Sequence, residues 1–121
     1  MKGIPAFAFS NDFGGDFALI ERELPLLLRE LLAQPRDPGE LWNVNFPGGG
    51  IAGFRGVLRE RTVAPTQLYL DRYVFEELPD GILLMHKRGV PAAADLAPEG
   101  SDVHAVLNGY ISVGKVRCTV L

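Results

Sequence analysis

Hydrophobic and polar positions fall into blocks along the first fifty residues. Residues 4–9 are apolar throughout, and residues 10–15 are polar or glycine except for Phe13. Apolar residues then recur at helical spacing, at positions 17, 20, 24, 27, 28, 31 and 32. A second, largely apolar run occupies 41–46 and contains Asn43 and Asn45. This pattern predicts a strand buried on both faces, a helix over 16–34 and a second strand, which together make one right-handed βαβ unit of a parallel sheet. Pro25 predicts a kink or a fresh N-terminal turn within that helix.

The rest of the chain reads as shorter elements joined by turns. Residues 67–78 and 82–87 flank the turn sequence Pro-Asp-Gly and predict a long β-hairpin. Ser101 or Asp102 is placed to cap a single helical turn that runs to position 107. A short strand over 110–113 and an apolar tail over 116–121 follow, and Cys118 is expected to be buried in that tail. We therefore divide the chain into the end of an α/β core, 1–50, and a β-rich region, 51–121, within one structural unit.

Composition narrows the class of protein. The 121 residues are 47% hydrophobic and 22% charged, as in a soluble globular domain. A net charge of −3 gives no basic surface for a nucleic acid polymer, and no apolar run is long enough to span a membrane. The single cysteine fits a reducing compartment, so we expect a cytoplasmic protein.

Two carboxylates follow the first apolar run. Asp12 and Asp16, with Asn11 as a neutral ligand, have the chemistry to bind Mg²⁺ or Mn²⁺. The alternative is that Asn11 and Asp12 shape a turn and Asp16 caps the helix, and the lack of a further acidic cluster favours this alternative. Neither His86 nor His104 has another potential ligand at a spacing typical of metal sites. We expect His104 to make a structural hydrogen bond to a nearby carbonyl or carboxylate.

A glycine pattern follows the second apolar run. Gly48, Gly50 and Gly53 form the literal sequence G-x-G-x-x-G, and Asp71 lies where a ribose-binding acid would be expected. Apolar spacing over 54–61 is compatible with a helix, so a dinucleotide-binding module is one hypothesis. Breaks over 62–65 leave this helix hardly two turns, and the alternative is a glycine-rich surface loop.

Three blocks of sequence, in order, resemble a known family. GIPAFAFS at 3–10, LWNVNFPGG at 41–49 and EGSDVHAVLNGYISV at 99–113 are similar to the carboxy-terminal half of the SurE (survival protein) nucleotidases. The resemblance implies an α/β, Rossmann-like partial SurE fold, with one βαβ unit of a parallel sheet, a β-hairpin arm and a short C-terminal strand. It also implies dimers or tetramers, and we expect the arm to contribute these oligomer contacts: Tyr69, Tyr73, Phe75, Leu83 and Met85.

The family's activity is the metal-dependent removal of phosphate from nucleotides, with Mg²⁺ or Mn²⁺. Its N-D-D-G motif and the other catalytic motifs belong to its amino-terminal half, so no catalytic residue is carried onto this chain. The second carboxylate of N-D-D-G would fall on Phe13, and Gly114-Lys115 replaces the usual Thr-Pro. We therefore expect a truncated module without a cofactor of its own, which is not catalytic alone and associates with copies of itself or with a complementary amino-terminal chain. An active phosphatase that uses Asp12 and Asp16 is the alternative.

Overall fold

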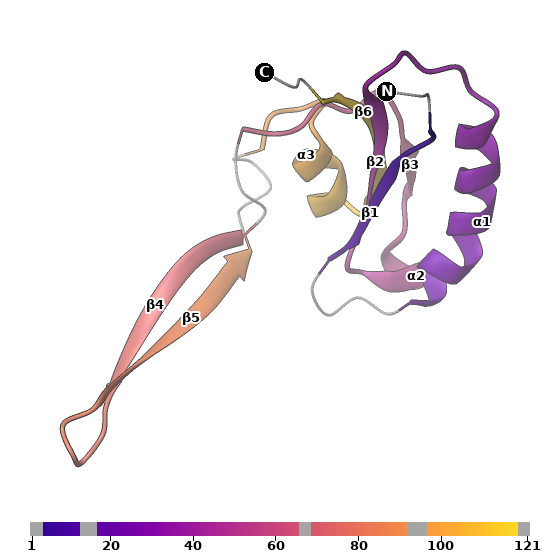
Figure 1. Ribbon diagram of the computed structural model, residues 1–121. Helices are drawn as coiled ribbons and strands as arrows, with labels where there is room; N and C mark the ends of the chain where they lie inside the picture. The colour runs from indigo at the N-terminus through magenta and orange to yellow at the C-terminus, as the bar shows by residue number, and fades with distance from the viewer. Residues whose placement is uncertain (1–3, 13–16, 66–68, 92–96, 119–121) are drawn as a thin grey trace.

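A four-stranded mixed sheet carries one helix on each face, and a long hairpin projects away from it (Figure 1). The computed structural model describes residues 4–12, 17–65, 69–91 and 97–118. The sheet has the strand order β1-β2-β6-β3, and the hairpin consists of β4 and β5. The elements are β1 (Phe7–Asn11), α1 (Ala18–Leu32), β2 (Glu40–Phe46), α2 (Gly50–Gly53), β3 (Gly56–Leu58), β4 (Tyr69–Glu77), β5 (Leu83–Pro91), α3 (Asp102–Leu107) and β6 (Tyr110–Arg117).

The predicted βαβ unit is confirmed. β1 and β2 pair in parallel, from Phe7 beside Trp42 to Asn11 beside Phe46, and α1 connects them. α1 runs through Pro25 as one helix, so the fresh N-terminal turn expected there is wrong, whereas the kink stays a prediction. Pro25 is the eighth residue of α1, beyond the first turn, so the carbonyl of Glu21 lacks its helical N–H donor.

The core lies between α1 and the sheet. Leu19, Leu27 and Leu31 form the buried stripe of α1 at helical spacing. Alternate residues of β2 and β6 face this stripe, and the buried cluster on the sheet consists of Trp42, Val44, Phe46, Ile111 and Val113.

β6 is longer than predicted and lies inside the sheet. It extends to Arg117, pairs antiparallel with β2 and parallel with β3, and thereby makes the sheet mixed. Residues 54–61, which had helical spacing, contain β3 instead of a helix. The predicted short final strand and the helix considered for 54–61 are therefore both wrong. Residues 56–58 form a strand because they pair with β6.

β1 is not buried on both faces as expected. Its outer edge pairs with no strand among the described residues, and Phe9 is 40% exposed. Phe7 and Phe9 stack on one another with ring centroids 5.9 Å apart. A continuous apolar run indicated a central strand, but burial also requires a neighbour on each side, and no described strand lies at the outer edge of β1.

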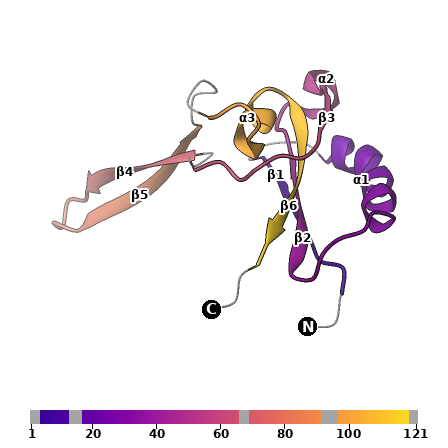
Figure 2. The same ribbon diagram turned by 90° about the horizontal axis from the view of Figure 1, so that it is seen from above.

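The hairpin is confirmed, with β4 and β5 antiparallel and Phe75 beside Met85. Gly81, at φ +83°, turns the chain, and Leu78 and Ile82 close the turn through an N–H to carbonyl bond of 2.8 Å. Both views show the hairpin extending away from the sheet (Figures 1 and 2). Cys118, expected to be buried, is exposed just beyond the end of β6. In the described residues, no helix is both long and apolar enough to cross a membrane.

Candidate functional site at the carboxyl edge of β1 and β2

The carboxyl ends of β1 and β2 meet at one edge of the sheet, as the ends of parallel strands do. In open α/β sheets, ligands bind in the crevice beyond such ends. A cavity of about 150 Å³ lies here, and α3 contributes its far wall. The cavity is lined by Ser10, Asn11, Asp12, Asn45, Phe46, Asp102, Val103 and Val106.

Asp12 is built into the turn that leaves β1. Its backbone N–H donates to the carbonyl of Phe46 at 3.2 Å, which extends the β1–β2 pairing by one residue. A Cβ atom on Gly48 would lie 2.8 Å from Oδ2 of Asp12. Because Gly48 has no side chain, the Asp12 carboxylate can pack directly against the backbone that follows β2. Asp16, the other proposed ligand and helix cap, lies outside the described residues.

Asn45 is a polar residue of this edge that the sequence analysis did not select. The hydroxyl of Ser10 donates to its Oδ1, which links the two parallel strands through their side chains. Its Nδ2 is buried and has no hydrogen-bond partner within the part of the chain that the structure describes. The sequence does show that polar and apolar residues alternate along β2, which places Asn43 and Asn45 on one face. This alternation does not show which of the two asparagines contacts a side chain of β1.

α3 begins as predicted, with Ser101 as its N-cap. The Ser101 hydroxyl accepts from the N–H of His104 at 3.1 Å. Asp102 Oδ1 accepts from the N–H of Ala64 at 2.8 Å, so this carboxylate ties the segment after β3 to the start of α3. The expected hydrogen bond of the His104 ring is not made by Nδ1, which is buried without a partner among the described residues.

Replacing Asp102 with alanine is expected to destabilise the protein by about 1–3 kcal/mol, because the N–H of Ala64 loses its acceptor. Urea denaturation followed by circular dichroism measures this loss. Asp102→Asn keeps an oxygen in place and is the matched control, for which we expect less than half of the loss. Equal losses in the two variants would contradict this role of the Oδ1 acceptor.

The acidic residues at this edge do not form a metal centre by themselves. Across the described ranges, no three His, Cys, Asp or Glu side chains are grouped so that they could hold an ion. Asp12 and Asp102 line the same cavity, but the hydrogen bond from Ala64 engages Asp102, and Gly48 packs against Asp12. The described residues of this edge do not fit a complete Mg²⁺ or Mn²⁺ site.

The glycine pattern does not open a dinucleotide-type helix. Gly50 and Gly53 bound the four-residue helix α2, Gly48 precedes it, and the chain then enters β3. Asp71 lies in β4 of the hairpin and not at the end of a strand beside the glycines. His86 is also in the hairpin, with Nε2 3.1 Å from Oε2 of Glu76. Of these residues, Gly48 therefore lies at the carboxyl edge of β1 and β2 against Asp12, whereas Asp71 and His86 belong to the hairpin.

Comparison with known proteins agrees with the three sequence blocks. No protein-family model matches the chain. The 5′-nucleotidase SurE 1 of Thermus thermophilus is 35% identical over 117 residues, which cover 94% of this chain and 44% of that protein. The 5′-nucleotidase SurE of Deinococcus radiodurans is 33% identical over 123 residues, which cover 95% of this chain and 42% of that protein.

The fold agrees as well. The crystal structure of the SurE protein from Aquifex aeolicus superposes with a TM-score of 0.70 at 25% sequence identity, over 98% of this chain and 48% of that one. The chain therefore spans less than half the length of the proteins that it matches. In sequence and in its partial Rossmann-like fold, the chain is similar to the carboxy-terminal half of the SurE 5′-nucleotidases.

Proposed function

We propose that the chain is the carboxy-terminal module of a SurE-type nucleotidase and is not catalytic alone. In this proposal it acts once a complementary amino-terminal segment, on another chain or on a longer form of this one, completes the α/β core. The observation that carries the proposal is the open outer edge of β1, which pairs with no described strand although its sequence has the apolar character of a central strand.

The side chains and backbone of β1 support this role. Phe7, Ala8 and Phe9 carry no charge, and an uncharged apolar strand edge readily accepts another strand. A strand added there would cover Phe9 and extend the sheet beyond the β1–β2 pair. With strands on both sides of β1, the cavity at the carboxyl edge would lie near the middle of that edge. Asn45 and Asp12 would then form one wall of a site shared with the added segment. The metal ligands and the Mg²⁺ or Mn²⁺ ion would come with the complementary segment.

Self-association through the hairpin is the second part of the proposal. Directly paired residues of antiparallel strands share a face, so Phe75 and Met85 lie on the same side as Tyr73 and Leu83. All four side chains are more than half exposed. Tyr69 belongs to the same alternation along β4. Glu77 and Lys87 lie on the same face, beside these exposed apolar and aromatic side chains. A second copy would cover the apolar part of this face, and we propose a homo-oligomer in the cytoplasm.

A phosphatase assay tests the proposal. With p-nitrophenyl phosphate and Mn²⁺, the chain alone should give no turnover above buffer. Co-expression with the amino-terminal segment of the Thermus thermophilus relative should give a complex that co-purifies and hydrolyses the substrate. Turnover by the chain alone that is lost in Asp12→Ala would overturn the proposal in favour of an independent metal phosphatase. Absence of co-purification would also count against it.

A further inference from the structure

The side of α1 that faces β1 is apolar and uncovered. Leu32, which is 56% exposed, lines a cavity of about 120 Å³ together with Pro5 and Phe7, so this side of the helix looks toward the start of β1. Leu28 lies one turn before Leu32 on the same side and is partly buried, and the exposed Pro25 lies a further turn back. The apolar stripe of α1 is therefore wider than the sheet beneath it covers.

β1 continues this apolar surface. Phe7 and Phe9 lie beside Trp42 and Val44 in the parallel register, and these two residues of β2 belong to the core cluster under α1. The stacked rings of Phe7 and Phe9 thus lie on the α1 face of the sheet, at the edge with which no described strand pairs. We call the following set of side chains the α1–β1 flank: Leu28, Leu32, Phe7 and Phe9.

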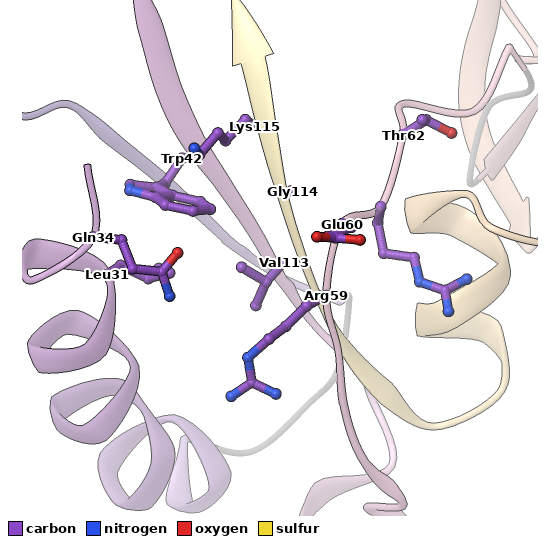
Figure 3. Close-up of a pocket in the computed structure, with 10 residues that line it drawn as sticks. Leu31, Gln34, Trp42, Arg59, Glu60, Thr62, Val113, Gly114 and Lys115 are labelled. Carbon is purple, nitrogen blue, oxygen red and sulfur yellow. The ribbon is translucent and has the colours of Figure 1, made fainter. Parts of the chain in front are cut away.

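The opposite side of α1 is already covered. The segment 59–62 faces it across a cavity of about 570 Å³, and Arg59 extends from this segment toward the helix (Figure 3). Glu30 accepts two hydrogen bonds from Arg59, at 2.7 and 3.1 Å. Arg22, two turns before Glu30, has its guanidinium carbon 5.5 Å from the centroid of the Phe54 ring. The two sides of α1 therefore differ, because polar contacts occupy one and the α1–β1 flank is open.

An open strand edge can be extended in two ways, which affect the flank differently. An antiparallel strand joined to β1 by a short turn brings no helix with it and leaves the flank exposed. A parallel strand that precedes β1 needs a crossover connection, usually a helix. The step from that strand to β1 has the same direction as the step from β1 to β2. Since such crossovers are right-handed in nearly all proteins, its helix lies on the same face of the sheet as α1.

The two faces of β1 support the second arrangement. The face away from α1 presents Ala8 and Ser10, beside Asn43 and Asn45 of β2, and offers little apolar surface to a helix. The α1 face presents the two phenylalanine rings. A helix on the α1 face would cover them together with the leucines of the flank, so the apolar surface favours a parallel strand with its helix beside α1.

We propose that the complementary segment supplies a strand parallel to β1 and an amphipathic helix that packs on the α1–β1 flank, side by side with α1. This inference rests on the proposed function and adds to it the surface that the partner helix uses. Glu21, two turns before Leu28, and Arg36, which lines the same cavity as Leu32, lie toward the two ends of the flank. The margin of the interface is polar there, as the rims of protein interfaces are.

Leu32→Glu tests the flank. The variant is co-expressed with an affinity-tagged amino-terminal segment of the Thermus thermophilus relative, and the amount of chain recovered with the tag is measured. The new carboxylate would be buried without a partner under the added helix, so recovery should fall to about a tenth of the wild-type amount or less. Leu26→Glu is the matched control, because Leu26 is 59% exposed and lies between Arg22 and Glu30 on the opposite side. It should be recovered as the wild type is, and thermal melts of each variant alone verify that it is folded.

A fluorescent label measures burial without a change of charge. In a Cys118→Ser background, Leu32→Cys and Leu26→Cys are each labelled with an environment-sensitive dye. In the chain alone, acrylamide should quench the two labels to a similar extent, because both positions are exposed. In the complex, the label at position 32 should be protected from acrylamide, and the label at position 26 should not.

The outcomes separate this inference from the proposed function. If the wild-type complex forms and Leu32→Glu is recovered equally well, the flank is not the docking surface, although the proposed function stands. If the wild type does not co-purify, both are wrong. Equal losses in folded Leu32→Glu and Leu26→Glu would contradict the choice of side. Protection of the label at position 32 in the chain alone would mean that a second copy covers the flank, and it would also overturn the inference.

Discussion

Gly114→Ala is expected to destabilise the protein by about 3 kcal/mol or more, at or beyond the upper end of what overpacking costs. A Cβ atom at this position would lie 2.1 Å from the carbonyl oxygen of Arg61 and 3.1 Å from its carbonyl carbon. Both atoms are backbone, so no flexible side chain can move aside. Either β6 or the segment 59–62 has to shift, and the bond between the N–H of Arg61 and the carbonyl of Val113 is then lost.

Chemical denaturation and thermal melting measure the effect, with an expected fall in Tm of more than about 10 °C. Gly53→Ala is the matched control, since a Cβ there would meet no atom within 4 Å. This control should be neutral, or stabilised by up to about 1 kcal/mol through the lower entropy of its unfolded chain. If Gly114→Ala is as stable as Gly53→Ala, the close crossing at β6 is wrong.

Phe75→Glu is expected to convert the proposed oligomer into a monomer. Phe75 is exposed and paired with Met85 on the face that also carries Tyr73 and Leu83. A carboxylate in the centre of that face would have to be buried against a second copy, and an unpaired buried charge costs several kcal/mol. Light scattering coupled to size-exclusion chromatography, at micromolar concentration, measures the mass of the particle.

The opposite face of the same hairpin supplies the control. Val74 is also exposed, but it pairs with His86 on the side that carries the contact between His86 and Glu76. Val74→Glu should leave the oligomer intact. A monomeric wild type, or dissociation by Val74→Glu but not by Phe75→Glu, would contradict the use of the Tyr73–Phe75 face.

Elements that depend on local periodicity could be predicted from the sequence, and those that depend on distant contacts could not. The stripe of α1 and the turn at Gly81 are encoded within a few residues, so both were found. β3 had helical spacing, and it becomes a strand because β6, fifty residues later, pairs with it. β6 itself was predicted too short because Gly114 resembles the end of a strand, whereas here it permits a close crossing.

The candidate site shows the same division. Asp12 was selected because a carboxylate after a strand is a local signal, and it does line the cavity at the carboxyl edge. Asn45 was missed because its position relative to Ser10 depends on the parallel register of two strands 35 residues apart. The cavity between the end of α1 and the segment 59–62 combines α1, β2, β6 and that segment, and no single stretch of sequence contains its pattern.

The position of β6 between β2 and β3 also determines the order in which the protein can fold. β2 ends at Phe46, but its antiparallel neighbour begins at Tyr110, and the whole hairpin lies between them in sequence. Strands so far apart in sequence pair slowly, because the chain loses loop-closure entropy before the strand contacts that compensate for this loss can form. During synthesis the hairpin is complete before β6 emerges. Its exposed apolar side chains therefore meet the solvent while Val44 and Phe46 still lack Ile111 and Val113 of the core cluster. A nascent chain at this stage exposes two apolar surfaces, one on the hairpin and one on β2. We expect chaperone binding or early assembly with a partner to protect the chain from aggregation until β6 has paired.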